Sequence, residues 1–155
     1  MTDLRRTIVV VDASRDTFEL LETYFETFGL AVRWCAVSEP KAAENLAARV
    51  AESDPDVVIY DIDLPYAASW RTALTLCFDA RIRCPFVFTT TNVRIARQLM
   101  AEVTRAAIIQ KPYALEELHA LVKEAIASYE RPAAPAAPAA ERRQRDRRRG
   151  DRRRG

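Results

Sequence analysis

The sequence contains little of what several common classes of protein need. It has a single histidine, His119, which argues against a self-phosphorylating histidine kinase. Its three cysteines, Cys35, Cys77 and Cys84, lie within apolar stretches, and they lack the paired short spacing of a zinc site and the density of a disulfide scaffold. We therefore expect them to be reduced thiols inside a core.

Long apolar runs are also absent. No run approaches the length of about 20 residues that a membrane-spanning helix needs. The N-terminus enters a strand-like run almost at once, without the apolar segment of a signal peptide. These observations predict a soluble, cytoplasmic protein with no transmembrane segment. A chain of 155 residues, 49% of them apolar, is long enough for one folded core and too short for two large domains.

The net charge of +2 hides two regions of opposite sign. Residues 1–140 carry 15 basic and 19 acidic side chains, whereas residues 141–155 carry nine arginines and three acids. Residues 131–140 read RPAAPAAPAA, a composition that predicts an extended spacer without a core. We therefore predict a folded domain over residues 1–130, an Ala/Pro linker over 131–140 and a disordered, Arg-rich tail over 141–155.

The Arg-rich tail contains the repeat DRRRG twice. Charge runs usually form a solvated segment without a partner, and that is one interpretation of this tail. Guanidinium groups are planar donors suited to phosphates, so binding to nucleic acid or to another anionic surface is the second interpretation. The sequence leaves both open.

Five short runs rich in β-branched residues alternate with helical patterns. Several runs are apolar without alternation, which is typical of parallel strands covered on both faces. The runs begin at Thr7, Ala31, Asp56, Pro85 and Ala106. After each run, apolar residues recur at spacings of three and four, as they do from Leu115 to Tyr129. This order predicts an α/β fold of five βα units with a doubly wound parallel sheet.

Polar side chains stand where four of these strands end. Asp12 ends the first strand, Asp61 the third and Thr90 the fourth, and Lys111 follows the fifth. The carboxyl ends of parallel strands meet at one edge of a sheet, so these side chains are expected to converge. A carboxylate can accept a phosphoryl group when cations and hydrogen-bond donors offset the added negative charge. This combination therefore predicts phosphoryl chemistry at that edge.

In four motifs the sequence resembles the receiver domains of bacterial two-component response regulators. The motifs occur in the family order over residues 7–129, and they read VVVDAS, DVVIYDIDLP, PFVFTTT and QKPY. The resemblance implies a flavodoxin-like (βα)5 fold with strand order 2-1-3-4-5. It also implies that Asp61 is the phosphoacceptor, Thr90 the switch hydroxyl and Lys111 the lysine that contacts the phosphate.

The resemblance further implies a cofactor and partners. Mg²⁺ would be held by Asp12, Asp61 and Asp63. The phosphoryl donor would be a sensor histidine kinase or a histidine phosphotransfer protein. A downstream protein would bind the face made by the fourth helix, fifth strand and fifth helix, which corresponds to residues 93–103 and 114–129.

Three positions depart from the family pattern. Ala13 stands where a second acidic metal ligand is expected, so metal affinity should fall unless Asp63 or Asp16 substitutes. Ile108 replaces an aromatic residue that changes rotamer on activation in many receivers. Thr91 is larger than the residue usually found there, and its bulk is expected to slow access to the acceptor.

Three functions follow from these observations. The first is a stand-alone receiver that signals or relays through protein contacts and is not an enzyme beyond its own phosphorylation and dephosphorylation. The second is a pseudo-receiver, an interaction module that Ala13 prevents from being phosphorylated and that acts through its Arg-rich tail. The third is a haloacid-dehalogenase-type phosphatase, suggested by the D-x-D spacing in DIDL. The chain lacks the cap domain and the downstream acidic pair of such phosphatases.

Overall fold

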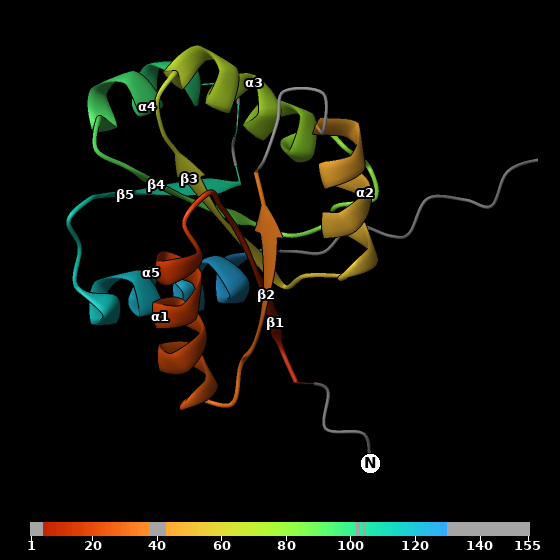
Figure 1. The fold of residues 1–155 in the computed structure, drawn as a ribbon, viewed down its shortest axis with the longest axis vertical. Helices are drawn as coiled ribbons and strands as arrows, with labels where there is room; N and C mark the ends of the chain where they lie inside the picture. Colours follow the sequence, from red (N-terminus) through yellow and green to blue (C-terminus); the bar gives the residue numbers. More distant parts are fainter. Residues whose placement is uncertain (1–4, 38–42, 102, 104, 130–155) are drawn as a thin grey trace, which may run out of the picture.

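The computed structural model describes residues 5–37, 43–101, 103 and 105–129 (Figure 1). Strands and helices alternate along these residues: β1 (Thr7–Asp12), α1 (Arg15–Glu26), β2 (Ala31–Ala36), α2 (Ala43–Glu52), β3 (Val57–Ile62), α3 (Tyr66–Cys77), β4 (Phe86–Thr90), α4 (Val93–Leu99), β5 (Ala106–Gln110) and α5 (Leu115–Ser128). The predicted Ala/Pro linker over 131–140 and the predicted Arg-rich tail over 141–155 lie outside the described residues.

The five strands form one parallel sheet in the order β2-β1-β3-β4-β5. This confirms the predicted flavodoxin-like fold and its strand order. The order reverses between β1 and β3, because β2 lies on one side of β1 while the later strands lie on the other. Side chains at the carboxyl ends of β1 and β3 therefore meet where open α/β sheets usually place their functional sites.

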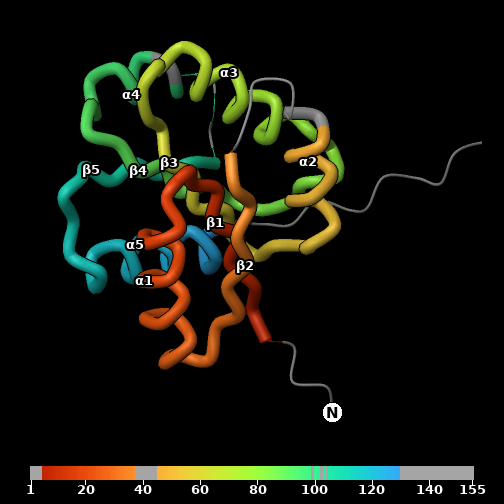
Figure 2. The backbone as a smooth tube through the Cα atoms, viewed as in Figure 1, coloured from red at the N-terminus to blue at the C-terminus, as the bar shows by residue number. Residues whose placement is uncertain are grey.

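Helices cover both faces of the sheet, which explains why the strand sequences are almost continuously apolar. On β1, Ile8 and Val10 point toward the core under α1 and α5, whereas Val9 and Val11 point toward α2, α3 and α4. The tube in Figure 2 shows the same division, with α1 and α5 on one side of the sheet. All three cysteines are buried, as expected for thiols inside a core. None of the described helices is long and apolar enough to cross a membrane.

Arg105 fastens the end of α5 to the amino edge of the sheet. Its guanidinium donates to Tyr129 Oη at 3.0 Å and also to the backbone carbonyls of Ile82 and Cys77. The same group lies over the Phe86 ring, 5.6 Å from its centroid. Since Arg105 immediately precedes β5, this cluster ties together β4, β5, α3 and the last described residue of the chain.

His119 joins α5 to α1 through aromatic contacts. Its ring centroid lies 4.3 Å from that of Phe28, 5.4 Å from that of Phe25 and 5.8 Å from that of Tyr24. Only 8% of the residue is exposed. Burial among these rings disfavours the charged imidazolium and lowers the pKa of His119, and the nearby charge of Lys123 lowers it further.

This environment predicts that the protein loses stability in mildly acidic solution. The unfolded chain takes up the histidine proton near pH 6.5, before the folded protein does, so the free energy of unfolding falls as the pH drops from 7 toward 5. Thermal unfolding followed by circular dichroism at pH 5.5, 6.0, 7.0 and 8.0 measures the effect. Because His119 is the only histidine, the melting temperature of His119→Gln should fall less over this pH range than that of the unmodified protein. An equal loss in both proteins would contradict this account.

Candidate functional site

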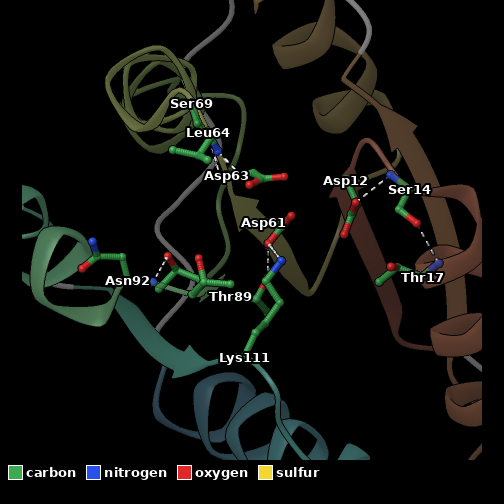
Figure 3. Close-up of polar contacts among 12 residues, drawn as sticks. Asp12, Ser14, Thr17, Asp61, Asp63, Leu64, Ser69, Thr89, Asn92 and Lys111 are labelled. Atoms are coloured by element: carbon green, nitrogen blue, oxygen red, sulfur yellow. Dashed lines mark hydrogen bonds and ion pairs between the residues drawn. The ribbon is translucent and has the colours of Figure 1, made fainter.

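The carboxylate of Asp61 lies at the carboxyl edge of the sheet, where two side chains contact it (Figure 3). The Lys111 Nζ atom is 2.6 Å from Asp61 Oδ1, and the Thr89 hydroxyl donates to the same oxygen at 2.9 Å. The Asp61 side chain is only 9% exposed, so its charge is offset mainly by these two groups. The second carboxylate oxygen points away from Lys111 (Figure 3).

The strand pairing explains why these residues meet. Asp61 on β3 lies opposite Thr89 on β4, and Thr89 lies opposite Ile109 on β5. Lys111 follows the last residue of β5, and its backbone N–H donates to the carbonyl of Thr90 at 2.8 Å. The backbone ladder thus brings the lysine beside the acceptor strand. The structure places Asp61 and Lys111 together, as the sequence predicted.

The hydroxyl that contacts Asp61 is that of Thr89, and the role of switch hydroxyl assigned to Thr90 stays a prediction. Thr90 is completely buried, and its Oγ1 accepts a hydrogen bond from the backbone N–H of Asn92 at 3.1 Å. Successive residues of a strand point to opposite faces, so only one of two neighbouring threonines can face Asp61. The structure brings Thr89 to the carboxylate and directs Thr90 to the start of α4.

Asp12 lies at the end of β1 and is 7% exposed. Its Oδ1 accepts a hydrogen bond from the backbone N–H of Ser14 at 2.7 Å. Burial raises the pKa of Asp12, and the negative charge of Asp61 raises it further, although the Ser14 hydrogen bond opposes both effects. The two carboxylates are therefore close enough to repel one another.

Trp34 supports Asp12 from the neighbouring strand β2. Its indole N–H donates to the Asp12 backbone carbonyl at 2.9 Å. The Trp34 ring also stacks on Phe18 of α1, with 5.5 Å between the ring centroids. These contacts join the backbone of Asp12 to both β2 and α1, and they give the site a fluorescent neighbour.

The third predicted metal ligand, Asp63, is exposed in the loop after β3. One of its oxygens, Oδ1, accepts a hydrogen bond from the backbone N–H of Leu64 at 2.7 Å. Among the described residues no three acidic, histidine or cysteine side chains are grouped as metal ligands, so Asp12, Asp61 and Asp63 do not form one set. Mg²⁺ commonly uses only one or two carboxylates and completes its shell with water and carbonyl oxygens. The repelling pair of Asp12 and Asp61 fits such a cation.

Two tyrosines that the sequence analysis did not assign lie at this edge. Tyr113 is half-buried, and burial followed by the charges of Asp12 and Asp61 raises its pKa. Tyr66 begins α3, and its hydroxyl forms a hydrogen bond of 3.1 Å with the Thr91 hydroxyl. Ile108, the residue that replaces the expected aromatic, is half-buried against the core under α2, α3 and α4.

The raised pKa of Asp12 predicts that removing its charge stabilises the protein. In Asp12→Asn the amide oxygen can keep the Ser14 hydrogen bond while the repulsion from Asp61 disappears. We expect its melting temperature at pH 7 without Mg²⁺ to rise by roughly 2–5 °C. The matched control is Asp79→Asn, because a hydrogen bond from Arg81 lowers the pKa of Asp79, and this variant should melt lower. A lower melting temperature for Asp12→Asn would contradict the prediction.

No protein-family model and no curated protein sequence matches this chain. Solved structures do match it. The chemotaxis protein CheY4 of Vibrio cholerae is 17% identical, with a TM-score of 0.66, and the match covers 78% of this chain and 98% of that one. A response regulator receiver protein from Sinorhizobium medicae is 19% identical, with a TM-score of 0.61 and coverage of 82% and 98%.

A CheY-like response regulator receiver domain protein from Methanospirillum hungatei is 17% identical, with a TM-score of 0.63 and coverage of 79% and 94%. The predicted resemblance is therefore confirmed in three dimensions. At these identities the similarity is one of fold. The described chain has the fold of response regulator receiver domains.

Proposed function

We propose that this protein is a receiver that accepts a phosphoryl group on Asp61 from a phosphohistidine donor. The observation that carries the proposal is the nearly buried Asp61 carboxylate, with Lys111 Nζ at 2.6 Å and the Thr89 hydroxyl at 2.9 Å. A carboxylate held between a cation and a hydroxyl at the carboxyl edge of a receiver-type sheet is suited to hold a phosphoryl group.

The chemistry follows from which oxygen is engaged. Lys111 and Thr89 both contact Oδ1, so Oδ2 is the oxygen that attacks phosphorus. A new O–P bond forms as the N–P bond of the phosphohistidine breaks, and the imidazole leaves with the electron pair of that bond. Lys111 and Thr89 then stabilise the phosphoryl oxygens, and the low exposure of the site strengthens these interactions.

Mg²⁺ is the cofactor that the acidic residues fit. We assign its carboxylate ligands to Asp12 and Asp61, and we leave out Asp63, the third residue predicted from the sequence, because the described residues hold no group of three such ligands. When bound, the ion supplies positive charge that offsets the charge of the phosphoryl oxygens. The hydrogen bond from Ser14 fixes the orientation of the Asp12 carboxylate, and Trp34 fixes its backbone.

The proposed partners follow from this role. The donor is a sensor histidine kinase or a histidine phosphotransfer protein in the cytoplasm. The downstream partner binds the face formed by α4, β5 and α5, or the phosphoryl group passes onward in a relay. On this proposal the protein signals by binding and does not turn over a free substrate.

Acetyl phosphate with Mg²⁺ provides a direct test of Asp61. The full-length protein should gain one phosphoryl group, seen by intact mass, which is lost on mild alkali treatment. Asp61→Asn should gain none, and Lys111→Gln should gain it at least about tenfold more slowly because a charge-assisted contact is gone. Asp79→Asn, a remote surface variant, should behave as the unmodified protein. An adduct that persists in Asp61→Asn would refute the assignment, as would no adduct from acetyl phosphate or from a phosphohistidine donor.

A second candidate function is favoured by one observation. Ala13 offers no ligand beside Asp12, and the described residues contain no group of three ligands for a metal ion. Without metal, the domain would be a pseudo-receiver that positions the Arg-rich tail for an anionic partner such as nucleic acid. Metal binding therefore distinguishes the two candidates.

Titration with Mg²⁺ while tryptophan fluorescence is recorded makes that distinction. Trp34 donates to the backbone of Asp12, so a cation bound by Asp12 and Asp61 should change its emission at millimolar Mg²⁺. The change should disappear in Trp34→Phe and in Asp12→Asn, and Trp70→Phe, which alters the buried core tryptophan, should retain it. If the unmodified protein shows no response up to about 50 mM, a level far above cellular Mg²⁺, the pseudo-receiver becomes the better function.

A further inference from the structure

The end of β4 carries three consecutive threonines whose hydroxyls each contact a different element. Thr89 donates to the Asp61 carboxylate, and Thr90 accepts from the backbone that begins α4. Thr91 forms a hydrogen bond of 3.1 Å with Tyr66, the first residue of α3. The short segment therefore connects the acceptor to the amino ends of two helices.

The Tyr66–Thr91 pair lies beside the acceptor. It joins the first residue of α3, the helix that follows β3, to the residue after β4, which is the neighbouring strand, and Asp61 is the last but one residue of β3. The ring of Tyr66 is half-buried and packs against the core under α2, α3 and α4, whereas Thr91 is exposed. The packed tyrosine thus holds the hydroxyl of a residue that would otherwise turn freely.

The hydrogen bond between Tyr66 and Thr91 can leave one hydroxyl hydrogen free for a third group. Each hydroxyl has one hydrogen to donate and lone pairs to accept. When the phenol of Tyr66 donates to Thr91 Oγ1, the hydrogen of Thr91 remains for another acceptor. Thr91 follows Thr89, whose hydroxyl contacts Asp61, by two residues, about 7 Å further along the chain at the carboxyl edge of the sheet.

We propose that Tyr66 is a positioning residue that aims the Thr91 hydroxyl at a phosphoryl group on Asp61. This inference rests on the proposed function, since it requires Asp61 to carry that group. A hydrogen bond to an anionic phosphoryl oxygen is stronger than one between neutral groups, and the bond from Tyr66 polarises the Thr91 hydroxyl further. The pair supplies the Thr91 hydroxyl, held in place by Tyr66 of α3, at a site where Ala13 supplies no second acidic ligand.

Beryllofluoride, a tetrahedral anion that mimics a phosphoryl group on a carboxylate, tests this proposal in the full-length protein with Mg²⁺. Fluorine NMR measures its affinity without any turnover. Tyr66→Phe keeps the packed ring and removes only the hydroxyl, and Thr91→Val keeps the shape of Thr91. Each should weaken beryllofluoride binding about 3- to 10-fold, the effect of one hydrogen bond. The double variant should bind no more weakly than Thr91→Val, because both changes remove one interaction.

The control is Tyr24→Phe, which changes a tyrosine in the aromatic contacts of α1 and should leave the affinity unchanged. Circular dichroism confirms that every variant is folded at the temperature used, so a purely structural role for Tyr66 would leave the affinity alone. Unchanged affinity in Tyr66→Phe, or strictly additive losses in the double variant, would overturn the proposal while the proposed function stands. If the unmodified protein binds no beryllofluoride, the proposed function fails and this inference fails with it.

Discussion

The ion pair between Lys111 and Asp61 is the contact on which the rest of the site depends. The Asp61 side chain is only 9% exposed, so water contacts it little, and the ammonium of Lys111 at 2.6 Å supplies the opposite charge. The two residues are 50 positions apart in the sequence. They meet because β3, β4 and β5 are laid down side by side in register, and because α4 and α5 cover the two faces around them. The register of the strands thus sets the distance between Lys111 and Asp61.

The electrostatic environment of Asp12 is less favourable than that of Asp61. Asp12 is buried near another carboxylate, and both effects raise its pKa. A bound cation would offset the repulsion between the two carboxylates. Ala13 offers no acidic group beside Asp12, and the neutral groups near this carboxylate are the Trp34 indole, which donates to the Asp12 backbone, and the Tyr113 phenol, whose pKa the two carboxylates raise.

The elements of the fold were predictable because apolar patterns report burial. The continuous apolar runs identified all five strands, and the polar residues that end them identified Asp12, Asp61 and Lys111. The choice between Thr89 and Thr90 was not predictable. Both lie in a run of three threonines, and only the strand register, with Asp61 opposite Thr89, decides which hydroxyl faces the acceptor. Tyr66 was missed for a related reason, since its contact with Thr91 joins the start of α3 to a residue 25 positions further along the chain, after β4.

The fastening of Tyr129 by Arg105 has a mechanical consequence. A force applied to the chain beyond residue 129 does not act on α5 alone, because the Arg105 guanidinium shares it with α3 and with the loop after α3. Arg105 is also the residue that begins the path into β5, and β5 leads directly to Lys111. Tension applied beyond residue 129 would therefore act on the amino end of β5, and this strand leads at its carboxyl end to Lys111 beside the acceptor. The end of the described chain is thus mechanically coupled to the acceptor site.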